Sequence, residues 1–136
     1  MILQSVLGVK DAITVFGTDY PTPDGTNVRD YIHVDDLADA HIRAMEKLKP
    51  GASIFCNLGT GNGFSVKQII ATVEKVTGKK VPVKYGPRRP GDAIALWADP
   101  SRARQLLGWE AKYKEPEEIV RSAWRWFEKH PNGYGK

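Results

Sequence analysis

Apolar residues recur every three or four positions in three stretches of the chain, which is the spacing of an amphipathic helix. This spacing predicts helices from about Asp35 to Leu48, from Ser65 to Gly78, and from Pro116 towards the carboxyl terminus. The stripes that define them are Leu37, His41, Ala44, Met45 and Leu48, then Val66, Ile69, Ile70, Val73 and Val76, then Ile119, Val120, Ala123, Trp126 and Phe127.

Short apolar or alternating segments between these helices read as strands. They cover Ala12 to Phe16, Val28 to His33, Ser53 to Leu58, and Val81 to Tyr85. A short helix should run from Asp99-Pro100 to Gly108, while Ser65 with Gln68 has capping-box spacing. Strands that alternate with helices indicate an α/β fold, and the absence of a linker or repeat favours a single domain over residues 1–136.

Composition narrows the class of protein. The 136 residues are 41% hydrophobic, which is enough for one modest core, and the four tryptophans are expected inside it. The net charge is +4, but Lys and Arg never form a run longer than two, so a nucleic-acid partner is not favoured. Cys56 is the single cysteine, which favours a reducing, cytoplasmic setting. No apolar run approaches the roughly 18 residues of a membrane span, and no signal peptide is evident.

A glycine-rich turn, Gly59-Thr60-Gly61-Asn62-Gly63, stands between a predicted strand and a predicted helix. A dinucleotide fingerprint Gly-x-Gly-x-x-Gly would need glycine at Phe64 or Val66, so the turn is interpreted as structural. A catalytic Tyr-x-x-x-Lys pair is also missing, because the residues four positions after Tyr20, Tyr31, Tyr85 and Tyr113 are Asp24, Asp35, Arg89 and Glu117. The three histidines are too dispersed for a metal site, so neither catalytic nor metal-binding residues are predicted.

Several motifs together closely resemble UDP-glucose 4-epimerases, which belong to the extended short-chain dehydrogenase/reductases. The motifs are Asp19–Thr26, Val28–Asp36, Asn57–Gly61, Arg88–Asp92, Leu107–Trp109 and His130-Pro131. The resemblance implies the carboxy-terminal, substrate-binding part of a Rossmann-type fold that lacks the amino-terminal NAD-binding half. NAD would serve the complete enzyme, and none is expected to bind this chain alone.

The same resemblance implies a site for UDP-glucose or UDP-galactose. Arg29 and Arg89 would bind the diphosphate, a task suited to planar, permanently charged guanidinium groups. Asp92 would accept a hydrogen bond from the ribose, and the strand Thr14-Val15-Phe16 would hold the uracil. From the residues alone, Arg29 could equally face solvent or pair with a carboxylate. Leu96 stands where family members often carry an aromatic residue, so one substrate contact would be altered.

Two other interpretations stay open from sequence. The chain could belong to a different nucleotide-sugar epimerase or dehydratase, or it could be a stand-alone, non-catalytic nucleotide-sugar binder. A binding-only role follows from either the fragment or the stand-alone interpretation, because the catalytic groups are missing. The elements suit packing on a larger parallel sheet, so a missing amino-terminal half as partner, marginal stability and self-association are expected.

Overall fold

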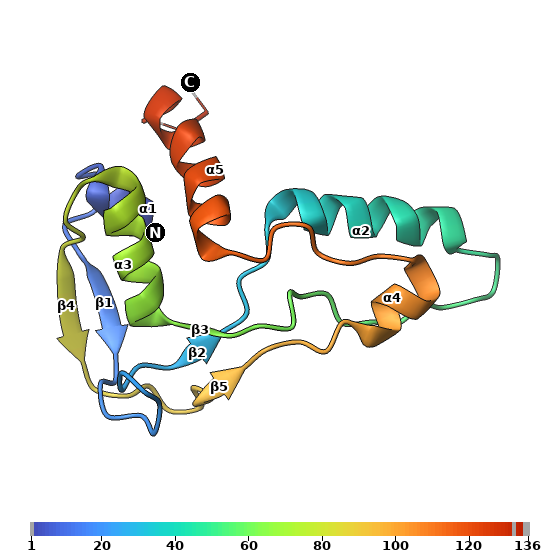
Figure 1. The fold of residues 1–136 in the computed structure, drawn as a ribbon, viewed down its shortest axis with the longest axis horizontal. Coiled ribbons are helices and arrows are strands. Elements are labelled where there is room, and N and C mark those ends of the chain that lie inside the picture. Colours follow the sequence, from blue (N-terminus) through green and yellow to red (C-terminus); the bar gives the residue numbers. More distant parts are fainter. Residues whose placement is uncertain (1, 132, 135–136) are drawn as a thin grey trace.

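The computed structural model describes residues 2–131, 133 and 134 of the chain, and these form an α/β fold (Figure 1). Its elements follow in the order α1 (Ile2–Val6), β1 (Ile13–Phe16), β2 (Val28–Arg29), α2 (Val34–Lys47), β3 (Phe64–Ser65), α3 (Val66–Thr77), β4 (Val83–Gly86), β5 (Ala95–Leu96), α4 (Ser101–Leu107) and α5 (Pro116–Lys129).

The described strands form two small sheets. β1 pairs in parallel with β4, in a register that joins Ile13 to Val83 and Phe16 to Gly86. In the second sheet β2 is central, with β3 antiparallel on one side and β5 parallel on the other. The two residues of β2, Val28 and Arg29, therefore join β3 to β5, which lie far from β2 and from each other in the sequence.

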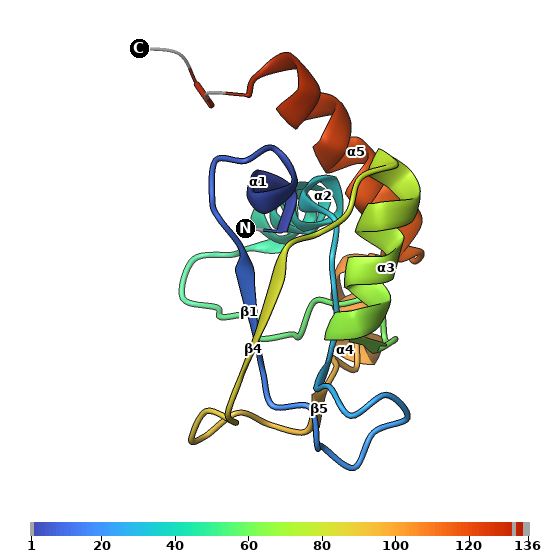
Figure 2. The ribbon, with the colours of Figure 1, turned by 90° about the vertical axis from the view of Figure 1, so that its left-hand side faces the viewer.

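Two hydrophobic clusters, in place of the one core expected from composition, hold the elements together. One joins α1, α3, α5 and the β1–β4 pair, with Leu3, Ile69, Val73, Val81, Val120 and Trp124 at its centre. The other lies between α2, α4 and the segment after α4, around Ala40, Ala103, Leu107, Trp109 and Ala111. Figure 1 shows the corresponding parts towards opposite sides of the molecule, with the short strands β2, β3 and β5 between them, and Figure 2 shows β1 and β4 next to each other with α3 to one side.

The local signals in the sequence explain where the helices start and stop. Ser65 and Gln68 form the predicted capping box at the start of α3, and Gly78 ends it in the left-handed conformation with φ 68°. Gly108 ends α4 in the same way at φ 61°. α5 begins with Pro116, whose missing amide hydrogen costs nothing at the first turn of a helix. These predicted boundaries are confirmed to within two residues.

The segment 53–58, predicted as a strand, belongs to neither sheet. Ile54, Cys56 and Leu58 pack against the second cluster while Phe55 is 72% exposed, so its side chains alternate as in a strand. None of its backbone N–H or C=O groups hydrogen-bonds to another described residue. A strand requires a hydrogen-bonded neighbour, and the described chain supplies none at this place.

Only part of the expected apolar face of α2 lies against the rest of the chain. Ala44 packs against the second cluster, but Met45 is 74% exposed and Leu48 is 52% exposed, whereas Asp36 and Ala40 are buried. The reason is the Asp36 carboxylate, which accepts the backbone N–H groups of Lys112 and Tyr113 at 3.0 and 3.1 Å and turns this side of α2 inward. Apolar periodicity identified the helix correctly, but a polar anchor decides which side is covered.

Two further expectations were wrong or incomplete. Trp109 is fully buried and Trp124 nearly so, but Trp97 is 55% exposed, because it follows β5 at the wall of a cavity described below. The short helix α1 was not predicted, since five residues are too few to show helical periodicity.

Candidate functional site

The six residues predicted to bind substrate line one cavity of about 200 Å³. They arrive from three places: β1 supplies Thr14, Val15 and Phe16, β2 supplies Arg29, and the loop after β4 supplies Arg89 and Asp92. Because β1 and β4 run parallel to each other, their carboxyl ends lie at the same edge of the sheet. The structure thus brings together residues up to 78 positions apart.

Arg89 is held in the cavity by an aromatic ring and a carboxylate. Its guanidinium carbon lies 4.6 Å from the centre of the Phe16 ring, a distance typical of a cation–π contact. Its Nε and Nη2 atoms donate to the two oxygens of Asp92 at 2.9 and 3.3 Å. This fork geometry orients the remaining N–H groups of Arg89 and keeps the positive charge beside β1.

Arg29 approaches the same carboxylate from the other side. Its Nη2 lies 3.9 Å from Asp92, and its Nη1 donates to the carbonyl oxygens of Val28 at 2.7 Å and Ala93 at 2.8 Å. The Ala93 contact depends on the parallel pairing of β2 with β5. Two guanidinium groups therefore converge on one carboxylate, which leaves a net positive charge for an anionic ligand.

Asp30 explains what the glycine-rich turn does. Its carboxylate accepts hydrogen bonds from the Thr60 amide at 3.0 Å, the Thr60 hydroxyl at 2.7 Å, the Gly61 amide at 3.2 Å and the Ala98 amide at 3.3 Å. A side chain at Gly59 would collide with Asp30 and with Ala98. The turn thus binds an internal carboxylate with the amides that a phosphate loop would offer to a nucleotide. This agrees with the interpretation of the turn as a structural element.

The proline-containing loop between β1 and β2 is fixed by acidic residues. Arg88 donates to the Asp19 carboxylate at 2.8 Å and lies 4.4 Å over the Tyr20 ring, so it serves this loop and not the cavity. Asp24 accepts hydrogen bonds from the Ser65 hydroxyl and from Thr26. Burial raises the pKa of Asp24, but these hydrogen bonds outweigh it and hold the pKa below its ordinary value of 3.8. The loop is thereby tied to the start of α3.

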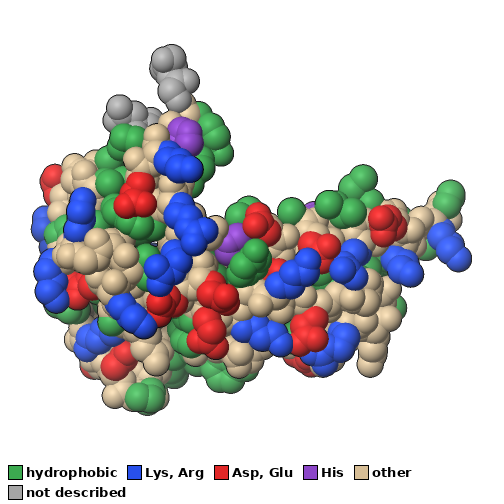
Figure 3. All heavy atoms as spheres, turned by 45° about the horizontal axis from the view of Figure 1, so that its top comes forward, with side chains coloured by type: hydrophobic (Ala, Val, Ile, Leu, Met, Phe, Trp, Pro, Cys, Tyr) green, Lys and Arg blue, Asp and Glu red, His purple; other side chains and the backbone are tan. Residues whose placement is uncertain are grey.

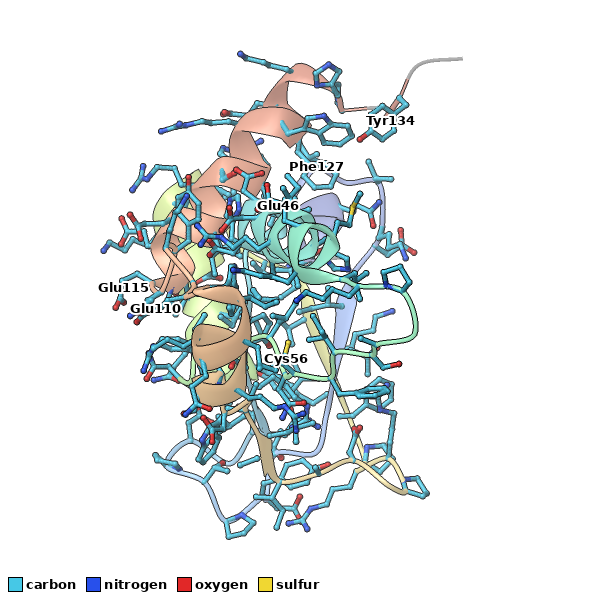
Figure 4. All side chains as sticks on the ribbon, turned by 90° about the vertical axis from the view of Figure 1, so that its right-hand side faces the viewer. Glu46, Cys56, Glu110, Glu115, Phe127 and Tyr134 are labelled. Carbon is cyan, nitrogen blue, oxygen red and sulfur yellow. The ribbon has the colours of Figure 1, made fainter. Side chains whose placement is uncertain are left out.

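A second, wider cavity of about 590 Å³ shares Arg29 with the first as a lining residue. Asp30, Leu96, Trp97 and Cys56 are among its lining residues. Figure 4 shows Cys56 in the middle of the molecule, on the extended segment below α2. Arg29 therefore borders both cavities.

Sequence reasoning missed two residues of the first cavity, Asn27 and Val66. Val66 was assigned to the buried stripe of α3, but it is the first residue of that helix and faces the cavity. Asn27 precedes β2 in a loop rich in turn residues, and no sequence signal separates it from an ordinary turn asparagine.

The described residues offer neither a metal site nor a membrane-spanning helix. They contain no cluster of three or more His, Cys, Asp or Glu side chains arranged for a metal ion. Nor does any helix in residues 2–131 have the length and apolarity needed to cross a membrane.

Several known proteins are similar to this chain in sequence and in structure. A UDP-glucose 4-epimerase of Lacticaseibacillus casei is 47% identical over 99% of this chain, and one of Cyamopsis tetragonoloba is 52% identical over 98%. The crystal structure of UDP-glucose 4-epimerase from Bifidobacterium longum in complex with NAD+ and UDP is 41% identical and superposes with a TM-score of 0.90 over 98% of the chain.

The chain spans only part of these relatives. It covers 41% of the Lacticaseibacillus protein, 38% of the Cyamopsis protein and 39% of the Bifidobacterium structure, and it matches their carboxy-terminal portion. The family model for GDP-mannose 4,6 dehydratase matches residues 12–122. The chain belongs to this family of Rossmann-type extended short-chain dehydrogenase/reductases, and within it is homologous to the UDP-glucose 4-epimerases.

Proposed function

We propose that this chain binds the UDP moiety of UDP-glucose and UDP-galactose, as the substrate-binding portion of a UDP-glucose 4-epimerase. The observation that carries the proposal is the convergence of Arg29 and Arg89 beside the strand Thr14–Phe16 in one cavity. The charge of this pair suits a diphosphate, and the exposed backbone edge of a short strand suits the hydrogen-bonding edge of a base.

The sizes of the two cavities support a specific placement of the ligand. Small-molecule sites usually enclose about 300–1,000 Å³, more than the roughly 200 Å³ of the first cavity. We place the uridine there, with Asp92 accepting from the ribose, and the diphosphate at the two arginines. The hexose then reaches the second cavity past Arg29, where Leu96 and Trp97 offer apolar surface.

Catalysis is assigned to the remainder of the relatives' fold. In the complete enzyme, bound NAD would supply a transient oxidation at C4 of the hexose. The glycine-rich turn of this chain does not fit the pyrophosphate of NAD, because the Asp30 carboxylate already uses the Thr60 and Gly61 amides and would repel an anion. This chain's part would be to fix the nucleotide, and hence the sugar, in position for that reaction.

The partner proposed for this chain is a sheet-bearing body of the kind that the other three fifths of the relatives would provide. Segment 53–58 offers a complete set of unpaired backbone groups, and α2 leaves Val34, Ile42, Met45 and Leu48 exposed. Figure 3 shows hydrophobic atoms along the upper side of α2 among charges of both signs. Without such a partner these surfaces would favour self-association.

Isothermal titration calorimetry with UDP-glucose in the absence of NAD tests the binding proposal. We expect saturable binding that UDP competes away and that Arg29→Gln and Arg89→Gln weaken. Arg121, which forms an exposed pair with Glu117 on α5, supplies the matched control variant Arg121→Gln. Equal binding of UDP-glucose and AMP would contradict a uridine site, and conversion of UDP-glucose to UDP-galactose by this chain alone would contradict the binding-only role.

A further inference from the structure

Asn27 is a polar residue of the first cavity whose side chain has no partner. It lies at the end of the loop before β2, and only 8% of it is exposed. Its backbone carbonyl accepts the Val66 amide at 3.1 Å, which anchors the main chain to the start of α3. Its side-chain amide makes no hydrogen bond to any other residue that the structure describes.

The amide is not fully enclosed, since the Tyr20 hydroxyl is the one completely buried side-chain polar atom without a partner among the described residues. A polar group that lines a cavity and bonds to no protein atom is free to bond to a ligand. The charged groups of the cavity wall are already engaged, because Arg29 and Arg89 bond to Asp92 or to carbonyl oxygens. Thr14 is exposed and reaches solvent. Asn27 therefore differs from these neighbours: it is neutral, little of it is exposed, and it lines the cavity without a protein partner for its amide.

We propose that the Asn27 side-chain amide is a binding group for the nucleoside part of the nucleotide ligand. The inference rests on the proposed function and assigns a residue that the resemblance did not. An amide combines a donor and an acceptor, which matches either the imide edge of uracil or the ribose hydroxyls. A diphosphate offers acceptors only and already has two guanidinium groups, so it is the poorer match.

The proposal has an unusual signature in the variant Asn27→Leu, which keeps the side-chain size. Because the amide bonds to nothing in the described protein, its removal should leave the urea midpoint of the free chain unchanged or raise it. Affinity for UDP should nevertheless fall about tenfold, since the ligand loses a hydrogen bond inside an enclosed site. A purely structural residue would lower stability and affinity together.

Calorimetric titrations of the 136-residue chain with UDP, UMP and 2′,3′-dideoxy-UDP complete the test. Asn27→Leu should weaken UDP and UMP by the same factor, because both carry the same nucleoside. If the partner is the ribose, the variant and the wild type will bind dideoxy-UDP equally; if it is the base, the tenfold difference will remain. Asn62 is exposed and outside the cavity, so Asn62→Leu should leave UDP affinity unchanged.

Three results would overturn the inference. They are a lower urea midpoint together with weaker binding, an unchanged affinity for UDP, and a loss confined to UDP while UMP binding is retained. A wild-type chain that binds no UDP at all would instead refute the proposed function itself and the inference with it. The two failures are therefore distinguishable.

Discussion

Asp92 binds Arg89 through both carboxylate oxygens, at 2.9 and 3.3 Å, within a loop that separates them by three residues. The same carboxylate lies 3.9 Å from Arg29, which comes from a different strand. Asp92 thus holds two cations at one point of the cavity before any ligand arrives. This arrangement keeps the guanidinium groups ordered and reduces the entropy lost when an anion binds.

The first prediction concerns these two cations. Replacement of Arg29 or Arg89 by Gln should lower the affinity for UDP by about ten- to a hundredfold, the usual effect of one charge-assisted hydrogen-bonding group. Affinity for uridine should change much less, because uridine has no phosphate. Fluorescence or calorimetric titration with both ligands measures the difference. An equal loss for both would mean that the arginines support the fold and not the diphosphate.

The second prediction concerns Asp30. Asp30→Asn should destabilise the chain by about 2–3 kcal/mol. Four hydrogen-bond donors face the Asp30 carboxylate, and an asparagine amide would turn its NH2 group, itself a donor, towards some of them. Urea unfolding measures the change. Asp39 forms a surface pair with Arg43 on α2, so Asp39→Asn should cost no more than about 0.5 kcal/mol. Similar costs at both positions would refute the assigned role of Asp30.

The third prediction concerns pH. The pKa of Asp24 in the folded chain lies below its ordinary value of 3.8. Its carboxylate therefore contributes stability that is fully present above that value and is lost as the pH falls from there through the folded pKa. Asp24→Asn removes this contribution, so the difference in unfolding free energy between wild type and variant should shrink from about pH 5 to about pH 3.

Asp11 supplies the comparison for that experiment, because it is exposed and lies outside the loop. Asp11→Asn should give a difference that stays small throughout the same pH range. A constant difference for Asp24→Asn would show that its hydrogen bonds are not sensitive to protonation, contrary to the structure.

The fourth prediction concerns the uncovered surfaces. Sedimentation velocity should show concentration-dependent association of the chain, and the double variant Met45→Lys/Phe55→Lys should shift it towards the monomer. Both side chains are more than two thirds exposed, so the substitutions should leave the fold intact. Val9 is exposed as well but lies near α5, and Val9→Lys is expected to have no such effect. A wild-type chain that stays monomeric at all concentrations would contradict the prediction.

The residues that sequence reasoning placed correctly are those whose local chemistry determines the outcome. Ser65, Gly78 and Gly108 mark helix ends through caps that depend on near neighbours alone. All six proposed binding residues meet at one cavity, but they were chosen from a family resemblance and not from periodicity. From the residue pattern alone, Arg29 could equally have faced solvent or paired with a carboxylate.

The residues that were misplaced depend on distant partners. Segment 53–58 has the side chains of a strand but no hydrogen-bonded neighbour in the described chain. Helix α2 is oriented by an aspartate that accepts from backbone amides 76 and 77 positions away. Asn27 was overlooked for the same reason, since only the folded cavity shows that it lines the site and that its amide has no protein partner. Such properties belong to the tertiary structure.

Thermal unfolding of the purified chain with and without UDP-glucose tests the central claim most directly, with UDP and AMP as companion ligands. A ligand that binds only the folded state must raise the midpoint, by on the order of 10 °C for a chain of this size at about 100 times the dissociation constant. We predict this rise with UDP-glucose and UDP, its loss in Arg29→Gln and Arg89→Gln, and no rise with AMP. An unchanged midpoint with UDP-glucose, or the same rise with AMP, would contradict a uridine diphosphate site in this chain.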